Sequence, residues 1–351
     1  MLRFVLCLIG LILAIPLLAL IVLACVLAIT ASGIGYLLGA FFAVCGLILA
    51  PWMKKFYLLV IAGLVSMALV AGTRISLIDR NPGSGVNMIA LPQGKATSWV
   101  NALIDEQDGL IFGETLFHWI GGDSDSEHRG LTSALQTAYS EMGQEGNFPS
   151  PIVSTYLGLQ QPGHFDAVII EPEGEPQFTV VFLHGYMGNV TAQCWEIAQA
   201  VRKLGGVTIC PSTVWTGEWW TPDGQAILHA TFEYVRAQGI ERFYLGGFSN
   251  GGFGISRLAS QWKEEQGLAG LFFIDGFTNG TSVRGVGVPI LILEGAQDER
   301  VPVAAARQFA SEVGDLGTYV ELEGDHFLIM KHPDLVQNEI MKWLEQQETG
   351  K

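Results

Sequence analysis

One serine stands in a setting that suits a nucleophile. It lies in the segment Gly247-Phe248-Ser249-Asn250-Gly251, which follows an apolar stretch and precedes a stretch with helical spacing. A serine hydroxyl is a weak nucleophile, so the fold must expose it beside a base and near hydrogen-bond donors. In a Gly-x-Ser-x-Gly pattern the two glycines leave room for a sharp turn between strand and helix. Because such pentapeptides also occur in ordinary turns, Ser249 needs partners elsewhere in the chain.

Two residues further along the chain supply the partners that a nucleophilic serine requires. Asp298 follows one apolar stretch, and His326 follows another at 319–322. His326 would take the proton from Ser249 as the serine attacks a carbonyl, while Asp298 would orient the imidazole. Asp275 also follows an apolar stretch and is the alternative acid. Each of the three also has a purely structural interpretation: Ser249 as a turn residue, Asp298 as a capping carboxylate and His326 as a surface loop residue.

Strand and helix patterns alternate from residue 152 onward, which predicts a mostly parallel sheet covered by helices on both faces. The predicted strands are 153–159, 165–170, 178–183, 207–210, 242–248, 271–274, 289–293 and 319–322. The predicted helices are 191–204, 223–238, 252–262 and 333–345. Because the serine, the acid and the histidine each follow a strand, we expect all three at one edge of the sheet.

Four motifs in this order resemble the α/β-hydrolase family, over about residues 152–346. They are His184-Gly185 after the third strand, the segment 247–251 around the serine, the acid segment 295–302, and the histidine loop 324–327. The resemblance implies an α/β-hydrolase fold, a Ser249-Asp298-His326 triad and no cofactor or metal. It also nominates the backbone N–H groups of Tyr186 and Asn250 as donors to the oxyanion that forms during acyl transfer.

Three tryptophans are candidates for the substrate-binding surface. Trp215, Trp219 and Trp220 follow the strand that ends at Cys210, and they could form an aromatic wall for an acyl or aryl group. The alternative interpretation is simple packing or a membrane-facing surface. The segment 276–288 is too short for the helical cap domain of many family members. We therefore expect an open site, unless residues 95–150 cover it.

The first 80 residues read as a membrane anchor. Three apolar runs, at about 4–29, 34–52 and 56–73, approach or exceed the roughly 18 to 20 residues that span hydrocarbon. A cleaved signal peptide is disfavoured, because the first apolar run is too long and no polar mature start follows it. The expected organisation is an anchor at 1–80, a linker and helical segment at 81–150, and a catalytic domain at 151–351.

Charge separates the anchor from the rest. The chain carries −15 and residues 1–80 carry +4, which leaves −19 for the remainder. An acidic domain is repelled by phosphate backbones, so nucleic-acid binding is disfavoured. Arg3 and Lys54-Lys55 favour a cytoplasmic N-terminus and a cytoplasmic loop, which places the catalytic domain outside the cytoplasm of a bacterial inner membrane. Arg74 and Arg80 argue against this, and two spans instead of three would leave the enzyme in the cytoplasm.

Only Cys194 and Cys210 lie outside the apolar runs. Both are expected near the catalytic edge of the sheet, so a disulfide between them is a hypothesis, and two separate buried thiols are the alternative. It depends on the outward orientation, because disulfides persist in oxidising compartments.

The predicted function is a membrane-anchored serine hydrolase that cleaves an ester, thioester or peptide-like amide, with carboxylesterase-like activity favoured. Its partners would be a small-molecule or lipid-like acyl substrate and the lipid bilayer. A second hypothesis is a catalytically silent α/β-hydrolase-fold domain that serves as a membrane-tethered binding or assembly module. A transporter or channel is disfavoured, because the apolar runs hold no acid or base at mid-span.

Overall fold

The computed structural model describes residues 2–78, 85–146, 148 and 150–349, in two compact units. The membrane unit comprises Met1–Asp79 and Ala102–Gly122, and the sheet unit comprises Arg80–Asn101 and Asp123–Lys351. The sheet unit therefore starts before the boundary expected at residue 151. Residues 81–84 of the expected linker lie outside the described residues, as does the side chain of Arg3.

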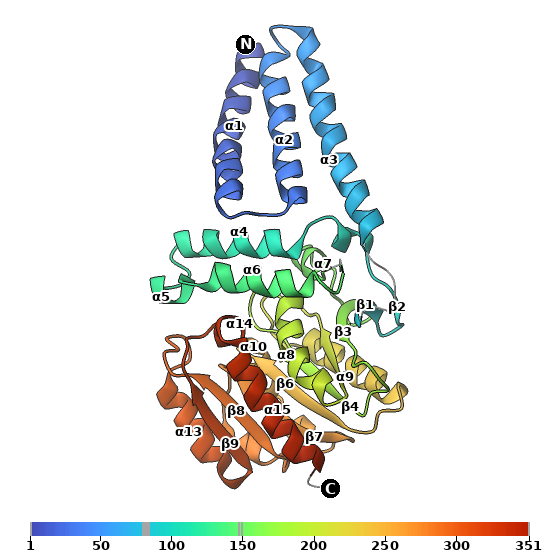
Figure 1. The fold of residues 1–351 in the computed structure, drawn as a ribbon, viewed down its shortest axis with the longest axis vertical. Coiled ribbons are helices and arrows are strands. Elements are labelled where there is room, and N and C mark those ends of the chain that lie inside the picture. Colours follow the sequence, from blue (N-terminus) through green and yellow to red (C-terminus); the bar gives the residue numbers. More distant parts are fainter. Residues whose placement is uncertain (1, 79–84, 147, 149, 350–351) are drawn as a thin grey trace. The chain divides into compact units, whose positions relative to one another are not determined.

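Three long helices form most of the membrane unit (Figure 1). They are α1 (Leu2–Val26), α2 (Ala31–Leu49) and α3 (Tyr57–Leu77), with the short 3₁₀ helix η1 (Lys54–Phe56) before α3. The segments Leu8–Val26, Ala31–Leu49 and Lys54–Leu77 have mean hydropathies of 3.1, 2.0 and 2.2, and each is long and apolar enough to cross a membrane. The three apolar runs predicted from the sequence are thus confirmed as helices, and α3 extends to Leu77.

Small residues allow α2 and α3 to pack closely. Gly39, Ala43 and Gly46 are the buried residues of α2, and Gly63 is the buried residue of α3. A Cβ atom on Gly63 would lie 2.3 Å from the carbonyl oxygen of Gly39 and 2.6 Å from the nitrogen of Ala43. Small residues at such interfaces let helix backbones approach, which drives association where no water is available to be released.

A fourth helix, α4 (Glu106–Trp119), belongs to the membrane unit and is tied to it by charges at its start. Arg74 near the end of α3 forms an ion pair with Asp105, the residue that caps α4, at 2.9 Å. The Asp108 carboxylate of α4 accepts hydrogen bonds from the backbone N–H and the hydroxyl of Thr30, at 2.7 and 2.6 Å. Since Thr30 lies between α1 and α2, this turn and the end of α3 are at the same end of the helix bundle.

The sheet unit is built on one sheet, which has nine strands in the described part of the chain, in the order β2-β1-β3-β5-β4-β6-β7-β8-β9. The strands are β1 (Val86–Leu91), β2 (Lys95–Ala96), β3 (Phe165–Ile170), β4 (Phe178–Leu183), β5 (Gly206–Pro211), β6 (Phe243–Phe248), β7 (Leu268–Ile274), β8 (Ile290–Gly295) and β9 (Gly317–Leu322). The strands from β5 to β9 in this order pair in parallel, while β3 is antiparallel to both of its neighbours.

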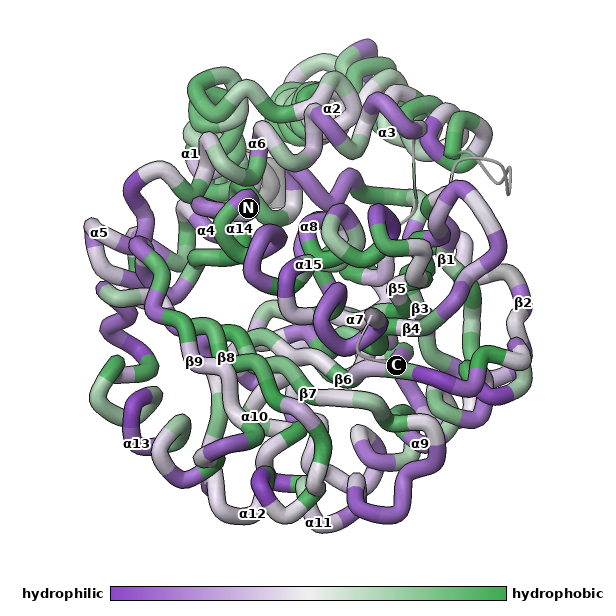
Figure 2. The backbone as a smooth tube through the Cα atoms, turned by 60° about the horizontal axis from the view of Figure 1, so that its bottom comes forward, coloured by the Kyte–Doolittle hydropathy of each residue, from purple (hydrophilic) through white to green (hydrophobic). Residues whose placement is uncertain are grey.

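Helices cover both faces of the sheet, and Figure 2 shows them in two groups. One face carries α8 (Thr191–Lys203) and α15 (Pro333–Thr349), which pack against each other. The other carries α9 (Pro222–Ala237), α10 (Asn250–Arg257), α11 (Ala259–Trp262), α12 (Gly280–Arg284) and α13 (Val303–Val313). The strands between the two groups are almost continuously apolar, as expected for strands buried on both faces.

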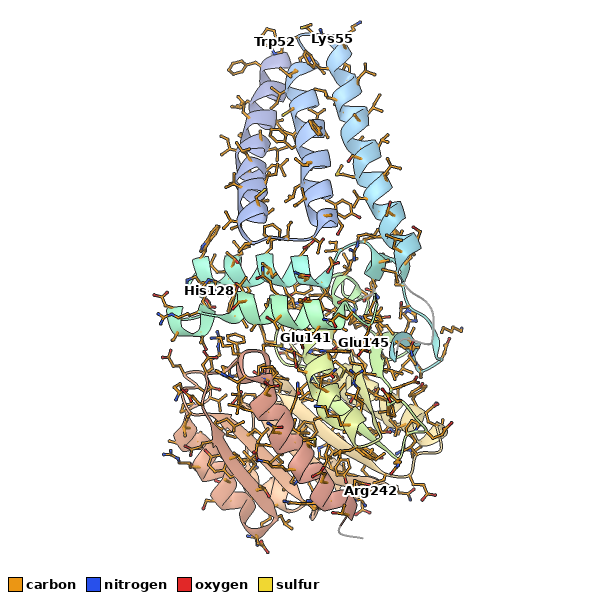
Figure 3. The ribbon with its side chains drawn as sticks, in the orientation of Figure 1. Trp52, Lys55, His128, Glu141, Glu145 and Arg242 are labelled. Atoms are coloured by element: carbon orange, nitrogen blue, oxygen red, sulfur yellow. A yellow bond between two sulfur atoms is a disulfide. The ribbon has the colours of Figure 1, made fainter. Side chains whose placement is uncertain are left out.

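The remaining helices of the described residues are α5 (Asp125–His128), α6 (Leu131–Met142), α7 (Ile152–Tyr156) and α14 (Leu328–Lys331), with the short 3₁₀ helices η2 (Trp99–Ala102) and η3 (Gly314–Leu316). Figure 3 labels His128 of α5 and Glu141 of α6.

Three predictions are wrong. Residues 153–159 do not form a strand, because most of this segment belongs to α7 and the turn after it. The helix predicted at 252–262 is divided at Leu258 into α10 and α11, and the expected linker contains β1.

Candidate active site

The backbone at Ser249 forms a strained turn between β6 and α10. Ser249 has φ 50° and ψ −117°, a conformation that a side chain disfavours and that the surrounding structure must enforce. The glycines on either side allow the turn to pack tightly. A Cβ atom on Gly251 would lie 2.0 Å from the carbonyl oxygen of Leu183, and one on Gly247 would lie 2.5 Å from the carbonyl carbon of Gly251. The segment thus has the strand-turn-helix geometry that the sequence motif requires.

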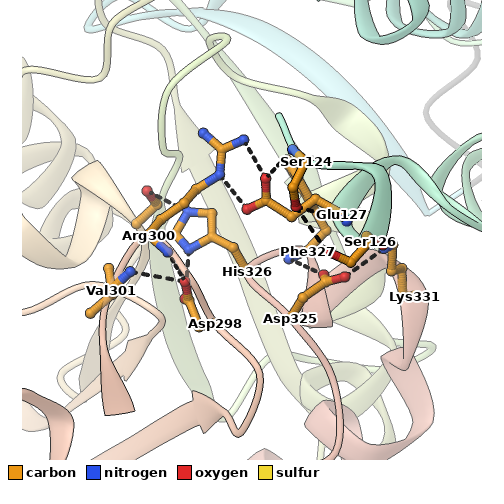
Figure 4. Close-up of polar contacts among 11 residues, drawn as sticks. Ser124, Ser126, Glu127, Asp298, Arg300, Val301, Asp325, His326, Phe327 and Lys331 are labelled. Carbon is orange, nitrogen blue, oxygen red and sulfur yellow. Dashed lines mark hydrogen bonds and ion pairs between the residues drawn. The ribbon is translucent and has the colours of Figure 1, made fainter. Parts of the chain in front are cut away.

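The serine, histidine and acid nominated from the sequence meet at one edge of the sheet. His326 Nε2 lies 3.0 Å from Ser249 Oγ, and His326 Nδ1 lies 2.7 Å from Asp298 Oδ2. The other oxygen of Asp298 accepts hydrogen bonds from the backbone N–H groups of Arg300 and Val301, at 2.7 and 2.9 Å (Figure 4). These contacts fix the carboxylate so that it faces the histidine. All three side chains are buried, with 9% of Ser249, 6% of Asp298 and 5% of His326 exposed.

The loop after β4 passes directly beside Ser249. A Cβ atom on Gly185 would lie 3.0 Å from Ser249 Cβ, so the backbone before Tyr186 is in contact with the serine. On the other side of the serine, Asn250 opens α10, and the N–H groups of a first helical turn have no acceptor within the helix. Its side chain donates to the carbonyl of Thr216 at 2.7 Å. The backbone positions nominated as oxyanion donors therefore flank the serine.

His184 supports this loop and is not placed to act as a base. It is 2% exposed, and its Nδ1 lies 2.8 Å from the carbonyl oxygen of Gly185, while its Nε2 lies 3.2 Å from the backbone nitrogen of Thr213. These partners assign Nδ1–H as donor and Nε2 as acceptor. Burial lowers the pKa of His184 to about 4, so the imidazole is neutral and fits both hydrogen bonds.

The three tryptophans proposed as an aromatic wall have different environments. Trp219 is fully buried, and its indole N–H donates to the carbonyl of His184 at 2.9 Å, so it packs under the loop and is not available to a substrate. Trp220 is half-buried beneath the Arg257 guanidinium, 3.9 Å from the ring centroid. Packing therefore explains both of these residues, and the expectation of a three-tryptophan wall is wrong.

Trp215 is the tryptophan of this set that faces solvent, with 39% of its surface exposed. Its ring stacks on that of Tyr156, with centroids 6.1 Å apart, and meets the edge of Tyr186 at 4.9 Å. Tyr156 and Tyr186 are themselves 50% and 43% exposed. From the sequence, Tyr186 was expected to contribute only its backbone N–H, and Tyr156 lies in the segment wrongly predicted to be a strand.

Two buried carboxyl groups lie behind the acid. Side-chain oxygens of Asp275, Glu294 and Asp298 lie within 4.8 Å of one another. Burial, with the nearby acids Asp298 and Glu321, raises the pKa of Glu294 to about 9, and burial raises the pKa of Asp275 well above its ordinary value. Glu294 therefore holds a proton at neutral pH, and burial favours the protonated form of Asp275. Asp275, the alternative acid, accepts a hydrogen bond from Gly295, whereas Asp298 bonds the histidine.

The spacing of these three carboxyl groups is one that a metal ion can use, but their chemistry does not fit a metal. Both oxygens of Asp298 already accept hydrogen bonds, and the other two groups favour a proton over a charge. A hard cation requires ionised oxygen ligands that are free to bind it.

Cys194 in α8 and Cys210 in β5 form the disulfide that was one of two alternatives in the sequence. The carbonyl of Cys210 accepts a hydrogen bond from the side chain of Asn189 at 2.7 Å. Because Asn189 follows Gly188 in the loop after β4, this hydrogen bond joins that loop to β5, and the disulfide joins β5 to the helix α8 that follows the loop.

No protein-family model and no curated protein matches the chain. Among solved structures, Est1E from Butyrivibrio proteoclasticus is 17% identical and matches with a TM-score of 0.43, over 52% of this chain and 94% of that chain. An alpha-beta serine hydrolase homologue from Coxiella burnetii is 21% identical, with a TM-score of 0.43 over 52% and 92%. A putative alpha/beta hydrolase from Agrobacterium tumefaciens is 16% identical, with a TM-score of 0.47 over 55% and 95%.

At these identities and scores the fold assignment rests on the chain itself. Apart from the short edge strand β2, the strand order β1-β3-β5-β4-β6-β7-β8-β9, with β3 antiparallel and a serine turn after β6, is that of the α/β-hydrolase sheet. The chain is an α/β-hydrolase fold preceded by three helices long and apolar enough to span a membrane.

Proposed function

We propose that the protein is a membrane-anchored serine hydrolase that cleaves a carboxylic ester, thioester or peptide-like amide through an acyl-enzyme. The observation that carries this proposal is the position of His326, which is within hydrogen-bond distance of both Ser249 and Asp298. This is the arrangement by which a neutral histidine removes the serine proton. Of the three bond types, we favour a carboxylic ester.

In the proposed reaction, Ser249 Oγ attacks the substrate carbonyl as His326 Nε2 accepts its proton. The developing negative charge on the carbonyl oxygen is held by the backbone N–H groups of Tyr186 and Asn250. The tetrahedral intermediate then collapses to the acyl-enzyme, and His326 returns the proton to the leaving group. Water repeats the sequence and releases the acid. Asp298 keeps the imidazole oriented and stabilises its cation throughout.

The exposed rings of Trp215, Tyr186 and Tyr156 support an apolar acyl or aryl group as the part of the substrate that is bound. They line one side of the loop whose backbone touches Ser249, so a substrate carbonyl at the serine would place its substituent near them. Aromatic rings contribute large apolar contact areas at low entropic cost. A small-molecule or lipid-like acyl substrate fits this surface, and the lipid bilayer is the proposed environment of α1, α2 and α3.

The experiment that tests the function is labelling with a fluorophosphonate probe followed by peptide mapping. The intact protein should be labelled at Ser249, and Ser249→Ala should lose the label. Ser256→Ala is the matched control, because Ser256 is a buried serine in the following helix whose hydroxyl bonds the Gly252 carbonyl. A folded protein that takes up no probe would instead favour the silent binding module.

We further propose that the catalytic domain lies outside the cytoplasm of a bacterial inner membrane. The Cys194–Cys210 disulfide supports this side, because such bonds persist in oxidising compartments. Alkaline phosphatase fused after Lys351 should be active, and a fluorescent protein that matures only in the cytoplasm should stay dark. The opposite result from the pair would place the catalytic domain in the cytoplasm.

A further inference from the structure

A short segment far from the site in sequence contacts the loop that carries the catalytic acid. The Glu127 side chain is 4% exposed and makes a two-pronged ion pair with Arg300, whose Nε and a terminal nitrogen donate to its two oxygens at 2.7 and 3.0 Å. Arg300 in turn donates its backbone N–H to Asp298 at 2.7 Å. One residue therefore joins the Glu127 carboxylate to the acid that orients the histidine (Figure 4).

The same segment also contacts the loop that carries the histidine. Lys331 donates to the backbone carbonyl of Ser126 at 3.1 Å and to the carboxylate of Asp325 at 2.6 Å, and Asp325 directly precedes His326. The Arg300 guanidinium lies over the ring of Phe327, 5.3 Å from its centroid. The segment Ser124–Glu127, which we call the clasp, thus bonds both loops that deliver the acid and the base.

Local structure prepares the clasp for this contact. Ser124 and Glu127 form a capping box, in which the Ser124 hydroxyl accepts from the Glu127 backbone N–H and the Glu127 carboxylate accepts from the Ser124 backbone N–H at 3.0 Å. Burial alone would raise the pKa of Glu127, but the hydrogen bonds from Arg300 and Ser124 outweigh it and hold the pKa below its ordinary value. The carboxylate is therefore ionised and held by partners on two sides.

We propose that Glu127 is a positioning residue of the active site, which acts through Arg300 to hold the Asp298 loop in register with His326. This inference rests on the proposed hydrolase activity. A bidentate arginine–carboxylate contact fixes both distance and orientation, which a single hydrogen bond does not. Because a displacement of about 1 Å at a reacting group lowers a rate by on the order of 100-fold, loosening the Asp298 loop should slow each turnover without preventing substrate binding.

The test is Glu127→Gln, which keeps the side-chain shape and removes the charge. We expect kcat to fall by about 10 to 100-fold with KM changed by less than about threefold. Arg300→Lys keeps the positive charge but loses the planar fork, so its kcat should fall by a smaller factor. The double variant Glu127→Gln/Arg300→Gln should be about as slow as Glu127→Gln alone, because both changes break the same contact.

The control is Glu321→Gln, which makes the same chemical change in an exposed bidentate pair with Arg307, at 2.6 and 2.8 Å. Its kcat should match that of the wild type. Burst titration with an acylating ester distinguishes a positioning defect from a loss of folded protein. A positioning defect leaves the full number of active sites, and each site turns over more slowly. Fewer sites that each turn over at the wild-type rate would overturn the proposal.

Two other results also count against the proposal. A folded Glu127→Gln protein with kcat within twofold of the wild type overturns it, as does a double variant whose losses multiply. If Glu127→Gln does not fold, Arg300→Lys and Ser124→Ala decide, because both keep the Glu127 carboxylate, and wild-type turnover in both would exclude the role. A wild-type protein that is neither labelled nor active would contradict the hydrolase function itself. That result is distinct from a failure of the role proposed for Glu127.

Discussion

The two units of this protein use their ionisable side chains in different ways. In the membrane unit Arg74, Asp105 and Asp108 lie at one end of the helix bundle, where α4 begins. In the sheet unit Asp275, Glu294 and Asp298 are buried together at the carboxyl edge of the sheet. Burying charge is costly unless it is paired or neutralised, so its presence in a core marks a chemical task. Charges at the end of the helix bundle act instead as ties between elements.

The most severe test of this contrast is Asp298→Asn. The amide preserves shape but disfavours the histidine tautomer that accepts the serine proton, so turnover should fall by about 10³ to 10⁴-fold. Steady-state kinetics with an activated ester, together with the melting temperature, measure this change. Asp275→Asn is the control, because burial favours the protonated form of Asp275 and its carboxyl group bonds Gly295 rather than His326. Equal losses in the two variants would mean that the acid has been assigned wrongly.

The second prediction concerns the ties of the membrane unit. Arg74→Ala removes the ion pair with Asp105 and the hydrogen bond from Nε to the carbonyl of Ala102 at 3.0 Å. We expect the start of α4 to open more easily, by about 1 to 3 kcal/mol, since a buried partner loses its hydrogen bonds. Hydrogen exchange of the α4 amides in detergent measures this directly. The exchange rate of Arg74→Lys should lie between those of the wild type and Arg74→Ala. Unchanged exchange in Arg74→Ala would show that the contact does not hold the start of α4.

Much of the sheet unit was predictable because its central strands are buried on both faces. Such strands read as continuous apolar runs, and β4 was predicted with the bounds that it has. The strand β1 was missed because it follows a segment rich in glycine and proline and is only partly buried. Residues 153–159 read as a strand because Ile152, Val153 and Thr155 are β-branched. Packing outweighed that preference and formed α7.

Part of the site was predictable because its residues follow strands that were predicted. Ser249, Asp298 and His326 each follow a predicted strand, and parallel strands bring their carboxyl ends to one edge. The capping box at Ser124 and Glu127 also has a readable pattern. Its contact with Arg300 joins residues 173 positions apart, and no local pattern encodes such a pair. The sequence also could not predict which tryptophan ring is exposed among Trp215, Trp219 and Trp220, because the three residues lie close together in the chain.

Per pH unit, the smallest expected effect is a pH dependence of stability, and it separates a buried carboxyl group from an exposed one. Glu294 is fully buried and its pKa is raised from 4.5 to about 9, so the folded protein holds a proton that the unfolded chain releases. Stability from this group is fully present below pH 4.5 and is lost as the pH rises toward 9. The slope is at most about 1.4 kcal/mol per pH unit for one proton. Glu294→Gln imitates the protonated acid, so its free energy of unfolding should fall less steeply across this range.

Glu321 provides the opposite case on the neighbouring strand. Hydrogen bonds from Arg307 and Tyr319 lower its pKa from 4.5 to about 2, so its contribution is present above pH 4.5 and is lost as the pH falls toward 2. Glu321→Gln should therefore act mainly on the acidic range, where it flattens the profile weakly, because the pair is exposed and screened by water. Thermal unfolding of both variants and the wild type from pH 2 to pH 9 measures the difference. If Glu294→Gln retains the wild-type slope between pH 5 and pH 9, Glu294 is ionised in the folded protein, and a proton does not neutralise this buried carboxyl group.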